Sequence, residues 1–258
     1  MKKLLLFIAA LAITSCSSDP IEFANTKPNA KIYAELIPGG VISSLPDSWE
    51  IALNGNILDE IKINTNFKDE MIYSSNQLME VHHYSLNSNN ATLLSVDNFE
   101  YNSNDKIEKI TNRNQDGVIT SIRTFNYTAP EFIEDKTVFY SSGTISSSYT
   151  AFKKIINGNV VESKDEYGNE QNYFTYDTKK NVFSDLQNLD NLVLYYSNKD
   201  SKVNKNNKLN SNSVFTFNNT ILNTIEYSYF NQYDSDNKIT ITNYAVDGIT
   251  HYKVNYTY

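Results

Sequence analysis

The histidines and their acidic neighbours are the residues whose types and spacing could hold a metal ion. Glu80, His82 and His83 stand close together, and imidazole and carboxylate groups are common ligands of transition metals. On an extended strand, however, His82 and His83 point to opposite faces, and only His251 remains as a distant third histidine. The sequence therefore favours surface histidines, and we expect neither a metal site nor a cofactor.

A second candidate is the run from Asn112 to Gly117, where oxygen-bearing side chains alternate before a glycine, as in the first half of a calcium-binding loop. The twelfth position of such a loop needs a bidentate carboxylate, and Arg123 stands there. A hairpin turn accounts for the same residues. The run from Asp234 to Asn237 lacks the glycine and is a weaker candidate still.

Sequence motifs of several enzyme classes are absent. The chain has no Gly-x-Ser-x-Gly elbow, no Gly-x-x-x-x-Gly-Lys-Ser/Thr phosphate loop, no His-Glu-x-x-His and no Cys-x-x-Cys. Thirty acidic residues could still supply the two carboxylates that glycoside hydrolysis requires. Nothing in the sequence singles out a pair, so no catalytic residue is assigned.

The nineteen tyrosines are the remaining functional lead. Aromatic rings on a solvated sheet face can stack on sugar rings, although cross-strand packing is the commoner use of tyrosine in a sheet. Tyr252, Tyr256 and Tyr258 share one face of a strand with Val254, which indicates core. Tyr195 and its neighbour Tyr196 point to opposite faces if extended, so one of them would be exposed.

The elements that position these residues are predicted to be strands. Aromatic and β-branched residues are abundant, and Asn-Gly and Asp-Gly pairs separate runs of alternating polarity. We predict one antiparallel meander of hairpins over residues 30–258 that forms an extended, twisted sheet, either open or partly closed, with a β-sandwich as the alternative. The predicted strands are 30–37, 58–64, 78–84, 93–101, 106–112, 118–127, 136–141, 144–155, 159–166, 170–176, 192–197, 213–218, 221–230, 238–245 and 249–258.

Two stretches break the strand pattern. Phe183, Leu186 and Leu189 recur at every third residue and predict a short helix near 182–190. The Lys- and Asn-rich tract 198–212 has too little apolar material for a core and is predicted to be a mobile loop.

The first residues are typical of an exported lipoprotein. Lys2 and Lys3 precede an apolar run too short to span a bilayer, and small residues lead to Cys16. We predict a signal peptide over 1–15, lipid on Cys16 and an extended tether over 16–29. Because Cys16 is the only cysteine, an incidental free thiol behind an ordinary signal peptide is the less favoured alternative.

The expected location is the outer membrane, because Ser17 rather than an acidic residue follows the cysteine. The sequence leaves open whether the body faces the periplasm or the cell surface. Removing Lys2 and Lys3 changes the formal charge from 22 − 30 = −8 to 20 − 30 = −10. Nucleic acid is therefore an unsuitable partner, since its binding depends on basic residues.

A degenerate unit of an aromatic residue, a few polar residues and an aliphatic residue recurs along the body. It occurs at 73–78, 101–107, 140–145, 176–182, 217–221 and 233–239, and its most specific copy is Tyr176-Asp-Thr-Lys-Lys-Asn-Val-Phe183. In these units the chain resembles the YD-repeat or RHS-like lipoproteins of Bacteroidetes, a family of unknown function. The resemblance covers roughly 70–258 and implies an antiparallel sheet, but no catalytic residue.

Two functions follow from the sequence. The first is a non-enzymatic binding or structural module of the cell envelope, held to the membrane through Cys16, with a glycan, peptide or envelope protein as partner. The alternative is a carboxylate-dependent hydrolase of an envelope or dietary polymer. Two buried acids facing each other across a groove would favour the second.

Overall fold

The structure, a computed structural model, describes residues 29–38, 40, 45–87, 90–127, 132–197, 203–218 and 220–258. The predicted signal peptide, Cys16 and all of the tether except Asn29 lie outside the described residues. The lipid site therefore stays a prediction.

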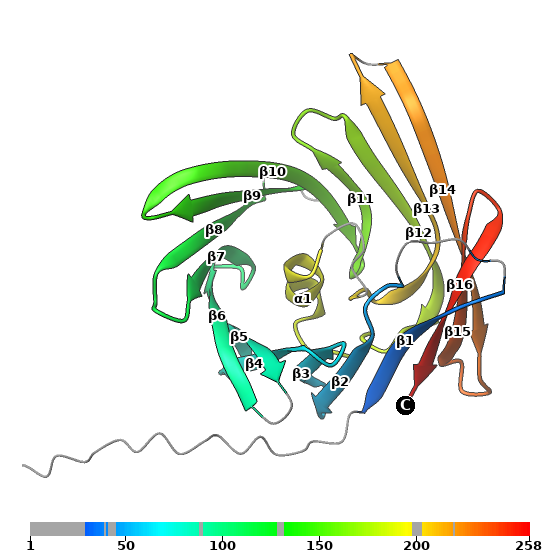
Figure 1. Ribbon diagram of the computed structural model, residues 1–258, viewed down its shortest axis with the longest axis horizontal. Coiled ribbons are helices and arrows are strands. Elements are labelled where there is room, and N and C mark those ends of the chain that lie inside the picture. The colour runs from blue at the N-terminus through cyan, green and yellow to red at the C-terminus, as the bar shows by residue number, and fades with distance from the viewer. Residues whose placement is uncertain are drawn as a thin grey trace, which may run out of the picture.

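Sixteen strands and one short helix make up the described part of the chain (Figure 1). The elements are β1 Ala30–Leu36, β2 Trp49–Asn54, β3 Ile57–Ile63, β4 Phe67–Ser74, β5 Gln77–Asn87, β6 Asn90–Tyr101, β7 Ile107–Asn114, β8 Ile119–Asn126, β9 Phe132–Ser141, β10 Thr144–Ile156, β11 Asn159–Asp165, β12 Glu170–Lys180, α1 Leu189–Tyr195, β13 Asn206–Phe217, β14 Thr220–Tyr233, β15 Ile239–Val246 and β16 Ile249–Thr257.

The strands pair in chain order, and the two ends of the series meet to close a barrel. Strand β1 pairs antiparallel with β16, from Lys31 opposite Thr257 to Leu36 opposite Tyr252. The prediction of an extended or partly closed sheet is therefore wrong, as is the sandwich alternative. Closure removes the two unpaired edges that an open sheet would expose, and the alternation within single strands contains no information about it.

Strands β2 and β4 lie where the sequence predicts none. In β4 the consecutive charges of Lys68, Asp69 and Glu70 conceal the alternation, because Lys68 and Glu70 face outward while Asp69 points into the lumen. Charged residues on both faces of one strand are the reason that the hydrophobic pattern fails there.

The predicted position of the helix is also wrong. It spans Leu189–Tyr195 rather than 182–190, and it replaces the predicted strand 192–197. Leu192, Val193 and Leu194 are all buried, because α1 lies inside the ring of strands (Figure 1). A short continuous apolar run of this kind cannot be distinguished from a buried strand by periodicity.

The predicted mobile loop 198–212 is wrong in its second half. Strand β13 begins at Asn206 and pairs with β12 and β14, whereas 198–202 lie outside the described residues. The inward positions of β13 include Asn207, Ser211 and Ser213, which line a polar part of the lumen. A strand facing such a space does not need the apolar residues on which strand prediction relies.

The segment Asn181–Ser197, here called the plug, is fastened to turns at one end of the barrel. The backbone N–H of Gln187 donates to the Asn56 carbonyl at 2.8 Å, and the Asn191 side chain donates to the Asp105 carbonyl at 3.1 Å. This end, called the plugged end, carries the β2–β3, β4–β5 and β6–β7 turns. The alternate turns of the meander, which include the β1–β2, β3–β4 and β15–β16 turns, lie at the opposite end.

Three tyrosine hydroxyls stabilise the plugged end by the same kind of hydrogen bond to a backbone carbonyl. The hydroxyl of Tyr101 donates to the Leu78 carbonyl at 2.6 Å, and that of Tyr127 donates to the Ile107 carbonyl at 2.8 Å. Tyr176 makes the equivalent bond to a carbonyl at the start of β11 at 2.6 Å. Each bond links the end of one strand to the start of the strand before it.

The outer face of the barrel carries charged side chains on many strands. The Lys68 side chain is only 2% exposed, and its ammonium lies 3.2 Å from Glu60 on the neighbouring strand β3 and 3.1 Å from Glu70 on its own strand. Where β1 meets β16, Lys253 of β16 pairs with Glu35 of β1 at 2.8 Å. These outward rows alternate with the inward rows that contact α1, where Ile51, Ile61 and Val81 are buried and lie alongside Asp69 and His83.

Candidate ligand-binding cavity

The plug divides the lumen into two unlike regions. Its apolar residues pack against the inner face of β2–β8, where Ile51, Ile61 and Val81 are fully buried. The region beside β12–β16 is not filled in this way and contains a cavity of about 620 Å3. Small-molecule sites commonly measure roughly 300–1,000 Å3, so this space can admit a ligand of that size.

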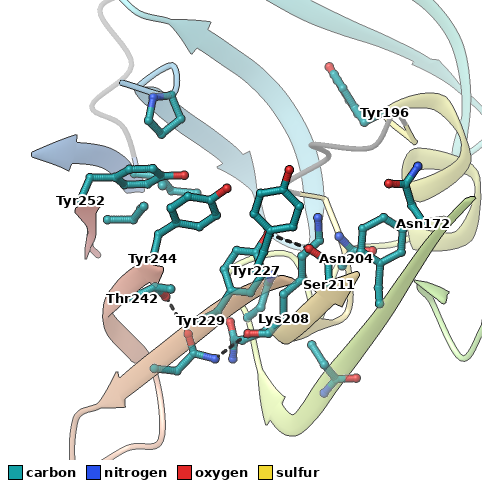
Figure 2. A pocket seen from close by; sticks show the side chains of 18 of the residues that line it. Asn172, Tyr196, Asn204, Lys208, Ser211, Tyr227, Tyr229, Thr242, Tyr244 and Tyr252 are labelled. Carbon is teal, nitrogen blue, oxygen red and sulfur yellow. Dashed lines mark hydrogen bonds between the residues drawn. The ribbon is translucent and has the colours of Figure 1, made fainter. Parts of the chain in front are cut away.

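Aromatic rings and side-chain amides dominate the wall of the cavity (Figure 2). Of the charged residues that the structure describes, only Asp47, Glu170 and Lys208 line it. The wall contains six tyrosines and six asparagines: Tyr196, Tyr227, Tyr229, Tyr244, Tyr252, Tyr256, Asn172, Asn181, Asn204, Asn206, Asn207 and Asn231. Such a wall offers many hydrogen-bonding groups but little net charge.

Three of these tyrosines form a ladder across β14, β15 and β16 (Figure 2). The ring of Tyr244 stacks on Tyr252 with 4.4 Å between centroids and on Tyr227 with 5.8 Å. Both faces of the Tyr244 ring are therefore covered by its neighbours. This wall presents ring edges and hydroxyl groups to a ligand, which differs from the open stacking platform that the sequence analysis envisaged.

The opposite wall is held by hydrogen bonds between amides and their surroundings. The Asn204 carbonyl oxygen accepts from the backbone N–H of Val160 and from the Tyr176 hydroxyl, both at 3.2 Å. The Ser213 hydroxyl donates to Asn172 at 2.6 Å. Since these bonds fix the orientation of each amide, the polar groups of the cavity are arranged before any ligand enters.

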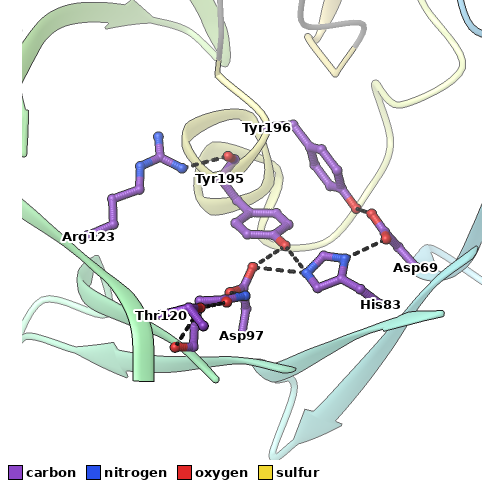
Figure 3. A network of polar contacts seen from close by, with 8 residues as sticks. Asp69, His83, Asp97, Thr120, Arg123, Tyr195 and Tyr196 are labelled. Carbon is purple, nitrogen blue, oxygen red and sulfur yellow. Dashed lines mark hydrogen bonds and ion pairs between the residues drawn. The ribbon is translucent and has the colours of Figure 1, made fainter. Parts of the chain in front are cut away.

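A separate polar network ties the end of α1 to the barrel wall (Figure 3). The His83 ring nitrogens contact Asp69 at 2.6 Å and Asp97 at 3.1 Å, and the Tyr195 hydroxyl donates to Asp97 at 2.7 Å. The Tyr196 hydroxyl reaches Asp69 at 3.1 Å. The two tyrosines of the helix thus bind two acids that share one imidazole.

Hydrogen bonding decides the charge state of this network. Burial alone would lower the pKa of His83, but its bonds to Asp69 and Asp97 outweigh burial and raise that pKa to about 10. Burial raises the pKa of Asp97, and the bonds from His83, Tyr195 and Asn112 bring it below its ordinary value. At neutral pH the histidine is a cation between carboxylates.

A second buried group caps the C-terminal end of the helix. The Arg123 guanidinium makes two bonds to Asp135, at 2.6 and 2.7 Å, and donates to the carbonyls of Leu194 and Tyr195. Cations at a helix C-terminus interact favourably with its carbonyls. Lys153 also contacts Asp135 at 2.5 Å, so one carboxylate holds two cations beside the helix end.

Lys153 and Ser197 are residue types that can form a nucleophilic pair, with 2.9 Å between ammonium and hydroxyl. Burial and Arg123 lower the pKa of Lys153 to about 8. Ser197, however, is 3% exposed, its hydroxyl donates to the Leu194 carbonyl, and it does not line the cavity. The geometry fits a helix cap better than a reacting pair.

The candidate metal ligands of the sequence do not come together in the structure. His82 and His83 point to opposite faces as predicted, with His82 outside on Glu80 at 2.7 Å. Among the described residues, no group of three His, Cys, Asp or Glu side chains is arranged to hold a metal. The run from Asn112 to Gly117 ends β7 and makes a turn in which Asn114 accepts two backbone N–H groups.

The predicted tyrosines contribute in part. Tyr252 and Tyr256 line the cavity with Val254, whereas Tyr258 is 50% exposed. The expectation that Tyr195 or Tyr196 is exposed is wrong, because Tyr195 ends α1 and Tyr196 follows it inside the lumen, where neither is exposed. The asparagines and Trp49 were not foreseen as a site. The alternation of Ile225, Tyr227 and Tyr229 in β14 does not separate a cavity from a core.

No helix within the described ranges is long and apolar enough to cross a membrane.

Comparison with known proteins gives little further information. No protein-family model and no curated protein matches the chain. Among solved structures, the chain is similar to a porin-like protein from Bacteroides uniformis ATCC 8492, with 12% identity, a TM-score of 0.37 and coverage of 93% of this chain and 99% of that chain. A likeness this distant carries no argument, so function must be argued from the geometry.

Proposed function

We propose that this protein is a non-enzymatic envelope protein that binds an uncharged, hydroxyl-rich ligand of the saccharide class inside its barrel. The observation that carries the proposal is the cavity of about 620 Å3 walled by tyrosines and asparagines. A saccharide offers hydroxyl groups that both donate and accept, and the tyrosines of the wall present hydroxyl groups and ring edges to them. Side-chain amides and tyrosine hydroxyls match those groups without requiring charge.

The charge balance of the wall favours this ligand class over an ion. Two carboxylates, Asp47 and Glu170, and one ammonium, Lys208, leave no concentration of either sign. Removing a charged ligand from water without a charged partner would be costly. A neutral ligand avoids that cost. The side-chain amides of Asn204 and of Asn172, which Ser213 orients, replace its hydrogen bonds to water.

The hydrolase alternative gains less from the structure. Asp69 and Asp97 are two enclosed acids facing each other, but His83 lies between them and bonds to both. A glycosidase needs one carboxyl group with a raised pKa as its proton donor. The pKa of Asp97 is lowered instead, and the network fits its role of fastening α1.

The proposed location is the outer membrane, with lipid on Cys16 as the anchor and the barrel standing in water. A barrel that spans lipid has an outward apolar band between aromatic girdles. Here Lys31, Glu50 and Lys253 are among the exposed charged residues on the outward face. This surface would be costly to place in hydrocarbon, so the anchor alone would hold the protein.

The resemblance to YD-repeat lipoproteins agrees with this proposal. Five of the six repeat units bracket a hairpin turn between consecutive strands, and the sixth leads from β12 into the plug. The tyrosines of two units, Tyr101 and Tyr176, make the strand-linking bonds at the plugged end. The repeat would then encode the barrel rather than the ligand.

Calorimetric titration of the mature chain with a panel of neutral oligosaccharides tests the function. We expect at least one saccharide to bind saturably, and Tyr244→Leu to weaken it by about tenfold or more, since a central hydrogen-bonding group and both stacking contacts are lost. Tyr173→Leu, on the outer face, is the matched control and should leave affinity unchanged. Saturable binding only of charged ligands or peptides would contradict the proposal.

A further inference from the structure

The cavity follows β12 and β13 along the whole length over which these two strands pair. At the end of the barrel opposite the plugged end, Glu170 lies opposite Phe215, and both residues line the cavity. At the plugged end, Lys180 lies opposite Asn206, and the cavity is lined there by Asn206 and by Asn181, the first residue of the plug. The cavity therefore reaches from the far end of the barrel to the plug.

This extent decides the shape of the cavity. Asn206 and Phe215 are 215 − 206 = 9 residues apart on β13. At roughly 3.3 Å per residue, less what the bulges in this strand take up, the wall between them is about 25–30 Å long. A round space of 620 Å3 would measure less than half that length. The cavity is therefore elongated along the strands and has the shape of a chain rather than of a compact molecule.

Polar side chains recur along the wall of this elongated space. Successive inward residues of a strand lie about 7 Å apart, and Ser211 and Ser213 are such a pair on β13. Asn172 of β12 lies opposite Ser213, and Tyr227 of β14 lies opposite Ser211. A ligand that lies along the strands therefore meets a new set of hydroxyl and amide groups at each step. Only a ligand built of repeated hydroxyl-bearing units can use all of these groups.

The two ends of the cavity offer different chemical groups. Near the plug the wall carries the side-chain amides of Asn181, Asn206 and Asn207. At the far end it carries the ring of Phe215 and the carboxylate of Glu170 instead. A compact ligand can contact only one of these sets, whereas a chain of sufficient length contacts both. The two ends of such a chain are then bound by different groups.

We propose that the ligand is a linear, uncharged oligosaccharide of several units that lies lengthwise along β12 and β13 with one end at the plug. This inference rests on the proposed function, and it adds the length and the placement of the bound molecule. A single sugar would leave most of the polar wall in contact with water. Each added unit gains contacts with groups that are already held in place, so affinity should rise with chain length until the cavity is filled.

Calorimetric titration of the mature chain with neutral malto-, cello-, xylo- and manno-oligosaccharides of one to eight units tests the proposal. In the series that binds, we expect affinity to increase by about tenfold or more from one unit to the longest chain, since the contacts add along the wall. The increase should then level off, because units beyond the filled cavity gain no further contact.

Two variants at opposite ends of the cavity test whether the chain spans it. Val182→Phe adds a ring beside the plug, and Phe215→Ala removes one at the far end. Each should weaken the longest chain by about fivefold or more, whereas the shortest saccharide that binds should be weakened by one of them at most. Val214→Phe and Phe152→Ala are the matched controls on the outer face, and neither should change affinity. Circular dichroism verifies that all four variants fold.

The outcomes separate this inference from the function on which it rests. If no saccharide of any series binds, the proposed function fails and the inference fails with it. If saccharides bind with an affinity that is the same from one unit to eight, only the lengthwise binding is overturned. A longest chain that is insensitive to either Val182→Phe or Phe215→Ala would also overturn it, because such a chain does not reach both ends.

Discussion

His83 and the acids around it connect single side chains to the position of the helix. The imidazolium bonds to Asp69 and Asp97, and each acid also accepts a hydroxyl from a tyrosine of α1. Removing one partner from such a buried network leaves the others unsatisfied, which costs more than the net gain of the intact bonds. The network therefore acts as a unit, and its stability should depend on pH.

The variant His83→Gln tests this dependence. Because the folded pKa of about 10 lies above the ordinary value of 6.5, the His83 cation contributes fully below pH 6.5, and its contribution is lost as pH rises towards 10. We expect the variant to be less stable by roughly 1–3 kcal/mol at pH 6. The difference in free energy of unfolding should shrink between pH 6.5 and 10.

Urea denaturation across this pH range makes the measurement. His82→Gln is the control, because His82 lies on the outer face, and it should change stability little at any pH. A difference between wild type and His83→Gln that stays constant from pH 6 to 10 would show that the imidazolium is not what holds the network.

The plug and the β10–β11 turn meet at Gly158, which shows how an element depends on a close approach. Gly158 has a φ of +76°, and a Cβ there would lie 3.1 Å from Lys205 Cβ and 3.3 Å from a methyl group of Leu189. Gly143, at the β9–β10 turn, has nearly the same φ of +78°, but a Cβ there meets nothing within 4 Å. The two glycines differ only in what surrounds them.

Alanine at each position separates backbone strain from packing. Both Gly143→Ala and Gly158→Ala should lose about 1–2 kcal/mol from the left-handed conformation. Gly158→Ala should lose a further ~1 kcal/mol or more, because Leu189 at the start of α1 must shift. Thermal unfolding of the two variants gives the comparison, and equal losses would mean that the plug does not pack tightly on this turn.

The sequence predicts the local elements better than their assembly. Alternation placed His82 and His83 on opposite faces and located most hairpins, because both depend on neighbouring residues. The same pattern failed to predict α1, because Leu192 to Leu194 are three consecutive buried residues. It also failed for β13, because the inward residues of that strand face a cavity rather than a core. Neither failure could be corrected without knowing what lies across the lumen.

Closure is the feature of the whole molecule that the sequence does not contain. The partners Lys31 and Thr257 come from the two ends of the body, and their pairing converts a meander into a barrel with an inside. The cavity exists only because of that closure, so it was equally unpredictable. What the sequence does predict at this scale is the anchor at Cys16 and an acidic, polar exterior.

Detergent phase partition of envelope proteins tests the proposed relation between barrel and membrane. The lipidated chain should enter the detergent phase, and Cys16→Ser should move to the aqueous phase, because the outward charges keep the barrel itself in water. A Cys16→Ser chain with its signal peptide removed that still enters the detergent phase would place the barrel wall in lipid and contradict this account.

The central claim is that a ligand binds inside the barrel, and Trp49 can report on it directly. It is the only tryptophan of the chain and lines the cavity, with its ring 5.9 Å from that of Tyr196. Titrating the saccharide found by calorimetry should produce a saturable change in Trp49 fluorescence, with the same affinity as the calorimetric binding. Ser211→Phe, which places a ring in the cavity, should abolish both signals. Calorimetric binding that leaves Trp49 emission unchanged and survives Ser211→Phe would place the ligand outside the lumen and contradict the account.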